Sequence, residues 1–270
     1  MLPIAIQLYS LRDDCAADFK ATLKKVKDMG FDGVEFAGLN GLTPAEVKAT
    51  CAELGLTPIS AHVSYYEMMG DPRGVLNAYA EVGCRYVVIP HIGAEYLAGG
   101  EKWPEMVANT TMLGEIAREL GMTLLYHNHD FEFEKVDGKY KLEHLYDTIS
   151  ADLLQTELDV CWVRVGGEEP APYVRKYAGR APVVHLKDYA GGKSEHMYEL
   201  IGIASEEKTS EEKPFEFRPV GFGVQDVPGI IAAATESGAQ WLVVEQDMPS
   251  MGLTPVECAE KSITYLRSLA

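Results

Sequence analysis

The sequence predicts a single-domain α/β protein, a (βα)₈ TIM barrel that spans residues 1–270. Three observations predict this fold: the chain length, a recurrent helix-to-strand unit, and polar residues that gather at predicted strand ends. The chain has 270 residues, close to the roughly 250 that are typical of such barrels. Its composition, 47% hydrophobic and 24% charged, is that of an ordinary globular protein. One hydrophobic core can therefore hold the whole chain.

The recurrent unit is an amphipathic stretch that ends in glycine and leads, within a few residues, into a short apolar run. Its glycine stands at six places: Gly30, Gly55, Gly83, Gly121, Gly179 and Gly238. Glycine just past a helix adopts a left-handed conformation easily, and a buried parallel strand is a continuous apolar run. The opening run 4–10 and the run 153–160 add two more strands, which gives the eight that a closed barrel needs.

Helix starts fit the same plan. The pairs Thr43-Pro44, Asp71-Pro72 and Thr254-Pro255 each place a capping residue before a proline, as at the first turn of a helix. The interval 189–219 interrupts the rhythm, because about thirty residues rich in Gly, Ser, Glu and Lys follow the seventh strand. We expect an elaborated loop there, which is a lid, a binding element or a disordered segment.

Composition also limits the kinds of partner that we expect the protein to bind. The formal net charge of −17, from 24 Lys and Arg against 41 Asp and Glu, disfavours nucleic acid, whose phosphates are bound mainly by Lys and Arg. No apolar run approaches the roughly 18 residues of a membrane span, and no signal-peptide pattern begins the chain. The 5 cysteines are scattered and form no C-x-x-C pair, as in reduced proteins. We expect a cytoplasmic protein with no membrane or nucleic-acid partner.

Polar residues stand late in nearly every predicted strand, where the active sites of such barrels lie. They are Gln7, Tyr9, Glu35, His62, His91, His127, His129, Glu157, Asp159, His185, Lys187, Glu245 and Asp247, and they include five of the 7 histidines. Side chains alternate along a strand, so strands five to eight present imidazole, carboxylate, imidazole and carboxylate to one point if these faces are internal. Such oxygen and nitrogen donors suit Mn²⁺, Co²⁺, Zn²⁺ or Mg²⁺. The alternative is a purely hydrogen-bonded polar core.

Several motifs in order carry a resemblance to a known family. They are IAIQLYSLRD, GFDGVEF, YHNHDFEF at 126–133, LDVCW at 158–162, HLKD at 185–188, VGFGVQD at 220–226 and VVEQD at 243–247. Together they resemble the xylose isomerase-like TIM barrels, which include sugar phosphate isomerases and epimerases, inosose dehydratases and barrel-type endonucleases. YHNHDFEF resembles the inosose dehydratase-like branch.

The resemblance implies a divalent metal ion held by Asp159, His185 and Glu245. The fifth strand departs from the E-x-x-N pattern of the family's sugar epimerases. The fourth ligand is therefore open between His127, which we expect, and two alternatives, His129 and Glu132.

Roles follow from the chemistry that such a metal serves. Isomerisation, epimerisation and β-elimination of a hydroxy-ketone all begin when a base removes a proton beside a polarised carbonyl and forms an enediolate. We expect Glu245 to be a ligand that also acts as acid and base, with Glu132 or His129 as the second proton carrier. The expected substrate-binding residues are His62, His91, Glu35, Trp162, Lys187 and Arg218. We also expect Lys187 and Asp188 to form an ion pair that supports His185.

Three functions compete. The first is a metal-dependent isomerase or epimerase of a small sugar or keto-sugar, in carbohydrate metabolism. The second is a lyase or dehydratase that acts on an inosose or a 3-keto-glycoside, which the histidine-rich fifth strand favours. The third is a non-catalytic sugar-binding barrel, which ranks last because Asp159, His185 and Glu245 are all present. The acidic charge disfavours an endonuclease, and a homo-oligomer is compatible with the resemblance.

Overall fold

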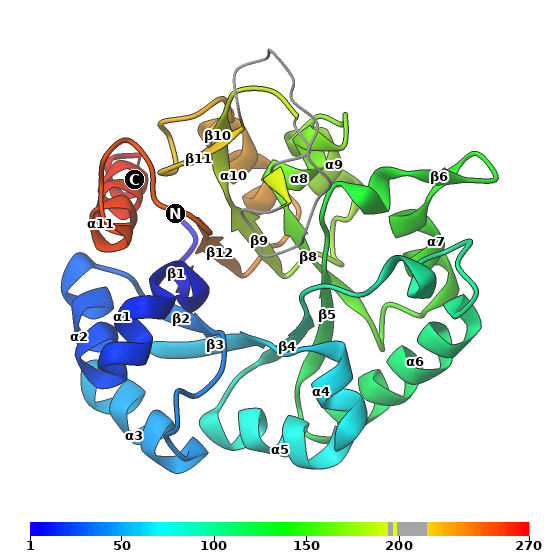
Figure 1. The fold of residues 1–270 in the computed structure, drawn as a ribbon, viewed down its shortest axis with the longest axis horizontal. Coiled ribbons are helices and arrows are strands. Elements are labelled where there is room, and N and C mark those ends of the chain that lie inside the picture. The colour runs from blue at the N-terminus through cyan, green and yellow to red at the C-terminus, as the bar shows by residue number, and fades with distance from the viewer. Residues whose placement is uncertain (194–196, 199–214, 270) are drawn as a thin grey trace.

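A closed barrel of eight parallel strands forms the centre of the computed structural model, which describes residues 1–193, 197–198 and 215–269 (Figure 1). The barrel strands are β1 (Ile4–Gln7), β2 (Gly33–Phe36), β3 (Thr57–His62), β4 (Tyr86–Ile89), β5 (Thr123–His127), β8 (Gln155–Asp159), β9 (Val183–Leu186) and β12 (Trp241–Val244). Neighbours around the ring pair in parallel, and β1 closes it by pairing with both β12 and β2. The predicted fold class is confirmed.

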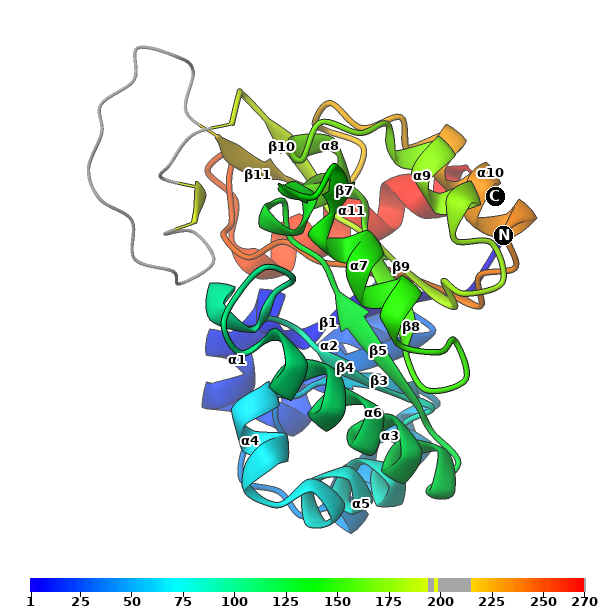
Figure 2. The same ribbon diagram turned by 90° about the vertical axis from the view of Figure 1, so that its right-hand side faces the viewer.

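Helices surround the barrel, as the views along and across it show (Figures 1 and 2). They are α1 (Arg12–Ala17), α2 (Phe19–Met29), α3 (Pro44–Leu54), α4 (Tyr65–Gly70), α5 (Pro72–Val82), α6 (Trp103–Glu119), α7 (Lys141–Thr148), α8 (Val160–Val165), α9 (Pro170–Lys176), α10 (Val227–Glu236) and α11 (Pro255–Ser268), with short 3₁₀ turns η1 (Leu8–Leu11), η2 (Ala94–Tyr96) and η3 (Phe131–Phe133). No helix among the described residues has the length and apolar character that crossing a membrane requires.

The three predicted helix starts are those of the structure. Thr43 and Thr254 each accept a hydrogen bond from the third residue of their helix, whose Glu side chain accepts one in return. Asp71 caps α5 by accepting a hydrogen bond from the backbone N–H of Gly74. The six glycines of the recurrent unit all have positive φ, between 65° and 103°, which a residue with a Cβ adopts at a cost.

The barrel interior changes character along its axis. A cluster of apolar side chains fills one part of the barrel: Ala5, Ile59, Tyr86, Val88, Leu125, Val183 and Val243. A larger apolar cluster lies between the strands and the helices. Toward the carboxyl ends of the strands the internal side chains become polar, with Glu35, Glu157 and His185 each fully buried. The buried ionisable residues thus lie above an apolar layer of the barrel interior, toward the carboxyl ends of the strands.

A short antiparallel pair follows the seventh barrel strand. In it β10 (Asp188–Ala190) pairs with β11 (Glu216–Arg218), and Figure 2 shows the pair near one end of the barrel. The predicted elaborated loop therefore begins and ends in paired strands. Residues 194–196 and 199–214, on which the expectation of a lid rests, lie outside the described residues. A second small pair, β6 (Lys135–Val136) and β7 (Lys139–Tyr140), precedes α7.

Candidate metal centre and active site

Four side chains from neighbouring strands converge at the carboxyl end of the barrel. His127 and Asp159 end β5 and β8, His185 lies in β9, and Glu245 follows β12 directly. One potential ligand atom of each lies within 4.8 Å of those of the other three. The nearest pairs are His127 Nε2 to Asp159 Oδ2 and His185 Nδ1 to Glu245 Oε2, both at 3.3 Å. We call these four residues the outer cluster.

The outer cluster has the chemistry of a metal site. Among the described residues, neither ring nitrogen of His127 has a hydrogen-bond partner, and Asp159 Oδ2 has none. Burial lowers the pKa of His127, so its imidazole is neutral and has a lone pair to offer. Buried polar atoms without partners are costly, and two imidazoles with two carboxylates and no sulfur suit a divalent cation. The four residues therefore fit the implied metal ion.

Below the outer cluster lies a second ionisable group, Glu35, His62, Glu157 and His185, which we call the inner cluster. His185 Nε2 is 2.8 Å from Glu35 Oε1, and His62 Nε2 is 2.6 Å from Glu157 Oε2. Gln7 and Ser60 donate further hydrogen bonds to the two oxygens of Glu35. Burial raises the pKa of Glu35, an effect that the charge of Glu157 reinforces.

His185 belongs to both clusters through opposite ring nitrogens. Its Nε2 faces Glu35 and its Nδ1 faces Glu245. A proton on Nε2 that is donated to Glu35 leaves the Nδ1 lone pair free toward the outer cluster. A carboxylate that binds the second nitrogen of a ligand histidine fixes its tautomer and orientation in metal proteins. Glu35 is placed to do this for His185.

Lys187 is a fully buried cation at the edge of the outer cluster. Its Nζ lies 2.6 Å from Glu245 Oε2, 2.9 Å from Asp247 Oδ2 and 3.5 Å from Asp159 Oδ2. The expected ion pair between Lys187 and Asp188 is wrong, because adjacent residues in an extended chain point to opposite sides. Asp188 instead accepts backbone N–H groups, including those of Gly221 and Gly223. Three carboxylates thus face one ammonium, so the group keeps an excess of negative charge that suits a further cation.

Glu132 lies beneath the loop that follows β5. Its two oxygens accept hydrogen bonds from the Tyr126 hydroxyl, at 2.6 Å, and from the His129 backbone N–H, at 2.8 Å. Burial raises the pKa of Glu132 to about 7, although these hydrogen bonds oppose the shift. The side chain of His129 stacks on Phe131 and lies against Trp162. Glu132 therefore orders the segment that carries His129.

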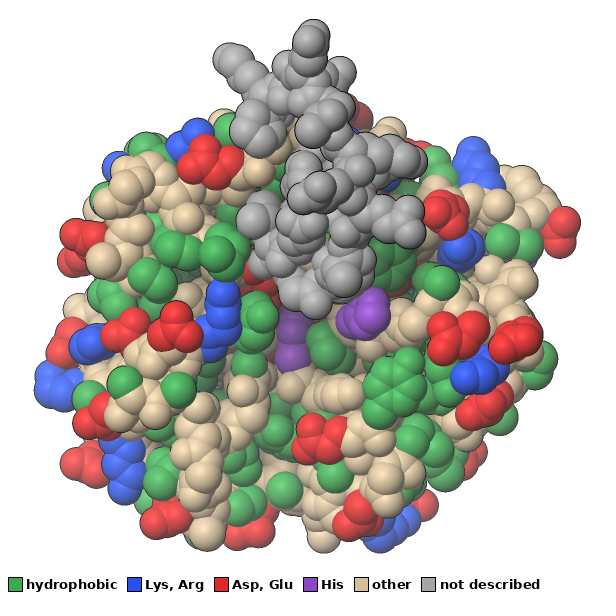
Figure 3. All heavy atoms as spheres, viewed as in Figure 1, with side chains coloured by type: hydrophobic (Ala, Val, Ile, Leu, Met, Phe, Trp, Pro, Cys, Tyr) green, Lys and Arg blue, Asp and Glu red, His purple; other side chains and the backbone are tan. Residues whose placement is uncertain are grey.

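A cavity of about 250 Å³ opens over the outer cluster. Its lining residues are Tyr9, Ala37, His62, Pro90, His91, His127, His129, Lys187, Glu245 and Asp247. Figure 3 shows histidine side chains at the surface near the centre of this face. We call this cavity the catalytic pocket. Within the described part of the chain, Lys187, which three carboxylates contact, is the one Lys or Arg that lines it.

A sequence profile decides the family. The profile of the xylose isomerase-like TIM barrel family matches residues 23–269. This chain belongs to that family.

Curated relatives of this xylose isomerase-like barrel include an inosose dehydratase of Bacillus thuringiensis (strain Al Hakam), which is 28% identical over 174 residues. The match covers 63% of this chain and 55% of that protein, so the chain spans about half the length of this relative.

Solved structures share the fold over nearly the whole chain. A sugar phosphate isomerase/epimerase from Parabacteroides distasonis ATCC 8503 superposes with a TM-score of 0.77 at 22% identity, covering 99% of this chain and 94% of that one. A protein called IOLI, crystallised with a zinc atom, has a TM-score of 0.70 at 15% identity, with 99% and 98% of the two chains covered.

The structure separates the predicted site residues of this xylose isomerase-like barrel into three groups. Residues that line the catalytic pocket are His62, His91, His127, His129, Lys187 and Glu245. Residues with no exposed surface behind it are Glu35, Glu132, Trp162, Asp159 and His185. Arg218 lies in β11, where its guanidinium binds Glu216 at 2.7 Å, outside the pocket lining. Among the candidates for a fourth ligand, His127 is the one in the outer cluster.

Two lining residues had a sequence signal but received no role. Tyr9 lies in η1, just after β1, and Asp247 lies a short way beyond the end of β12; both line the catalytic pocket. Their position late in a strand was the available clue. Ala37 and Pro90 line the pocket without any chemical signal in the sequence, because their contribution is only the path of the backbone.

Proposed function

We propose that this protein is a divalent-metal-dependent sugar isomerase or epimerase, which acts on a small sugar or keto-sugar through an enediolate. One observation carries the proposal: two imidazoles and two carboxylates meet beneath a pocket, and buried ligand atoms among them have no partner within the described part of the chain. Asp159, His185, Glu245 and His127 would hold the ion. The fold relatives, one a sugar phosphate isomerase/epimerase and one crystallised with zinc, support it.

When bound, a divalent cation polarises a substrate carbonyl and stabilises the negative charge that develops as the adjacent proton leaves. Glu245 and His129 both line the pocket, and His129 Nδ1 has no hydrogen-bond partner among the described residues. We assign the proton transfers to these two groups. Glu132 acts as a positioning residue because it holds the His129 backbone. His62 and His91 line the pocket wall, where ring nitrogens can bind substrate hydroxyls.

A lyase or dehydratase that acts on an inosose or a 3-keto-glycoside is the second candidate, and the inosose dehydratase relatives favour it. It begins with the same proton abstraction. The enediolate then expels a hydroxyl or alkoxyl group from the neighbouring carbon, and a pocket acid protonates the leaving oxygen, so that water or an alcohol departs. The two candidates share the site and differ in the product.

Proton exchange tests the proposal. The purified protein is stripped with a chelator, reloaded with Mn²⁺, Co²⁺, Zn²⁺ or Mg²⁺ in turn, and incubated with keto-sugars and inososes in deuterated water. We expect metal-dependent deuterium incorporation beside the carbonyl, with an isomer or epimer as the product. Loss of water or an alcohol instead would assign the dehydratase or lyase. Failure to bind any of the metals, together with no exchange, would leave a sugar-binding barrel and reject both enzymes.

A further inference from the structure

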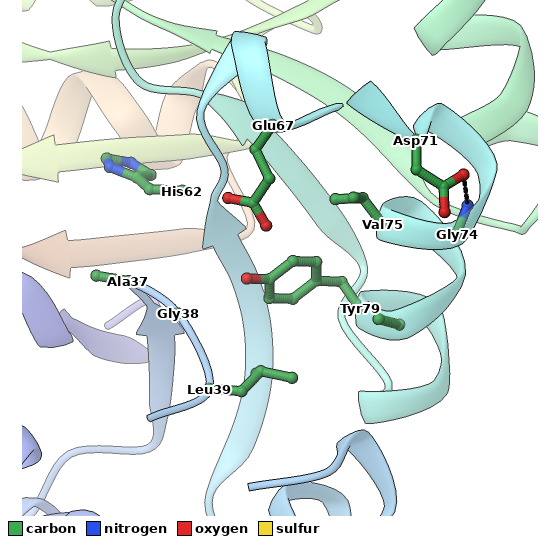
Figure 4. Close-up of a pocket in the computed structure, with 10 residues that line it drawn as sticks. Ala37, Gly38, Leu39, His62, Glu67, Asp71, Gly74, Val75 and Tyr79 are labelled. Atoms are coloured by element: carbon green, nitrogen blue, oxygen red, sulfur yellow. Dashed lines mark hydrogen bonds between the residues drawn. The ribbon is translucent and has the colours of Figure 1, made fainter. Parts of the chain in front are cut away.

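A second and larger cavity, of about 660 Å³, adjoins the catalytic pocket. Figure 4 shows it between the segment after β2, which carries Leu39, and the helices α4 and α5, which carry Glu67 and Val75. Ala37 and His62 line both cavities. The side chain of His62 therefore stands at their common edge, and a molecule seated over the outer cluster can extend past it.

The lining of this adjoining cavity combines an apolar wall with hydrogen-bonding groups. Leu39, Val75 and Ala78 contribute aliphatic surface. Glu67 is exposed and points into the cavity, as does the hydroxyl end of Tyr79 (Figure 4). Such a mixture matches a sugar ring, which has an apolar C–H face and hydroxyls around its edge.

Charge excludes an anionic occupant. The described lining includes the carboxylates of Glu67 and Asp71 and no Lys or Arg. One oxygen of Asp71 is engaged by the backbone N–H of Gly74 at 3.0 Å. A phosphate would meet acidic groups without a compensating cation, whereas neutral hydroxyls can donate hydrogen bonds to them.

Size points to a substrate of two parts. Pockets for small molecules usually measure about 300–1,000 Å³, and the catalytic pocket, at about 250 Å³, lies below that range. It is suited to a single ring. The adjoining cavity is large enough for a second group of at least the same size.

We propose that the adjoining cavity is a subsite for a neutral sugar residue, joined through a glycosidic bond to the keto-sugar ring that reacts over the outer cluster. The substrate class is therefore a keto-glycoside rather than a free keto-sugar or inosose. This inference rests on the proposed function for the identity of the reacting ring. His62 lies beside the bond between the two rings, and Glu67 and Tyr79 bind hydroxyls of the second.

The test compares 3-ketoglucose with a 3-keto-glucosyl disaccharide that carries one additional neutral glucose. The measured quantity is the ratio of kcat/KM values, disaccharide over monosaccharide, for metal-dependent proton exchange. We expect a ratio above about ten in the native protein, as roughly 1.4 kcal/mol of added transition-state binding would give. Val75→Trp should fill the cavity and bring the ratio close to one.

Asn77→Trp is the matched control, since it adds the same bulk to an exposed position of α5 outside the cavity lining, and the high ratio should persist. Glu67→Gln is a second variant at an exposed position, where we expect the ratio to fall several-fold without a packing change. Impaired folding would lower both kcat/KM values together and leave the ratio intact. A ratio near one in the native protein, or one unaffected by Val75→Trp and Glu67→Gln, overturns the subsite.

Binding of the unoxidised disaccharide, measured by titration calorimetry, separates this inference from the proposed function. Exchange of 3-ketoglucose without a preference for the disaccharide rejects the subsite and retains the enzyme. Disaccharide binding that Val75→Trp abolishes and Asn77→Trp preserves, in the absence of any exchange, retains the sugar subsite and rejects the catalytic proposal. Absence of both exchange and binding rejects both.

Discussion

The outer and inner clusters contain the same kinds of residue and share His185, yet their hydrogen bonding differs. In the inner cluster Glu35 accepts hydrogen bonds from Gln7 and Ser60 and contacts His185, and Glu157 contacts His62. Within the described residues, Glu157 Oε1 is the one buried side-chain oxygen or nitrogen of the inner cluster without a partner. In the outer cluster both nitrogens of His127 and one oxygen of Asp159 lack partners among those same described residues.

This contrast separates a cluster that can bind a metal ion from a cluster that holds the ligand side chains in position. Unpartnered buried atoms are tolerated where a ligand completes them, whereas a hydrogen-bonded network fixes the side chains around it. We therefore interpret the outer cluster as the metal site and the inner cluster as its support. Variants of the two clusters should then differ in the size of their effect on metal affinity.

The largest effect should follow Asp159→Asn. Asp159 has two roles, because Oδ1 caps α8 by accepting the N–H groups of Cys161 and Trp162, while Oδ2 faces His127. Asparagine keeps an oxygen for the cap and removes the anionic ligand. We expect metal affinity, measured by competition with a chelating dye, to fall more than about 100-fold, which is a larger loss than changes to residues behind the ligands cause. Metal-dependent exchange should also be lost.

Asp226→Asn is the matched control for this variant. Asp226 is exposed and caps α10 through the N–H of Gly229, so it shares the capping role of Asp159 without its place in the cluster. Its metal affinity should equal that of the native protein. An Asp159→Asn protein that binds metal as tightly as Asp226→Asn would contradict the assignment of the outer cluster.

Glu35→Gln should lower metal affinity by a smaller factor, and it tests whether the inner cluster supports the metal site. Glu35 has no exposed surface and contacts the outer cluster through His185. Loss of a carboxylate behind a ligand histidine typically costs about 10–100-fold in metal affinity, and we expect a loss in this range by the same competition measurement. Glu53→Gln, on the exposed side of α3, should have no effect. Equal affinities for the two variants would remove the distinction between the clusters.

Glu132→Gln should change the pH dependence of stability. The pKa of Glu132 is about 7 in the folded protein against an ordinary 4.5, because burial disfavours its charge. A raised pKa means that the folded protein loses stability as pH rises from about 4.5 through 7. At 1.36 kcal/mol per unit, the loss is on the order of 3 kcal/mol.

The free energy of unfolding, from urea denaturation between pH 4 and pH 8, measures this loss. Glutamine does not titrate, so the native protein should lose about 3 kcal/mol more than Glu132→Gln over that interval. If the two proteins lost stability in parallel as pH rises, the pKa of Glu132 in the folded protein would have its ordinary value, and the prediction would be wrong.

Much of the fold and of the outer cluster could be predicted from the sequence. The glycine at each helix end and the apolar runs specify local geometry, and parallel strands bring their carboxyl ends to one face. Strand order and alternation brought the strand-end residues of strands five to eight to one point, and the family resemblance implied Asp159, His185 and Glu245 as ligands. His127 was the expected choice among three for the fourth ligand, and in the structure one potential ligand atom of each of the four lies within 4.8 Å of the others.

The depth at which each strand-end side chain lies below the barrel opening could not be predicted from the sequence. Glu35 and Trp162 were expected to contact substrate, but neither has exposed surface, since register and the covering side chains decide how far a strand-end residue lies from the opening. The Lys187–Asp188 pairing failed because Lys187 turns inward to three carboxylates. The adjoining cavity had no sequence signal, since it depends on the separation between the segment after β2 and α5.

Arg218→Ala should have the smallest effect, and it tests a contact that lies in neither cluster. The Arg218 guanidinium pairs with Glu216 of the same strand, and both side chains are partly exposed, at 24% and 44%. Exposed ion pairs contribute about 0–1 kcal/mol to stability. We expect the variant to change the free energy of unfolding by less than about 1 kcal/mol, with kcat/KM for proton exchange within twofold of native. A rise in KM of about tenfold or more, with kcat retained, would place Arg218 in contact with the substrate. Substrate recognition would then extend from the catalytic pocket to β11. The site would have a third part, a substrate contact on β11, beside the outer cluster that binds metal and the inner cluster that supports it.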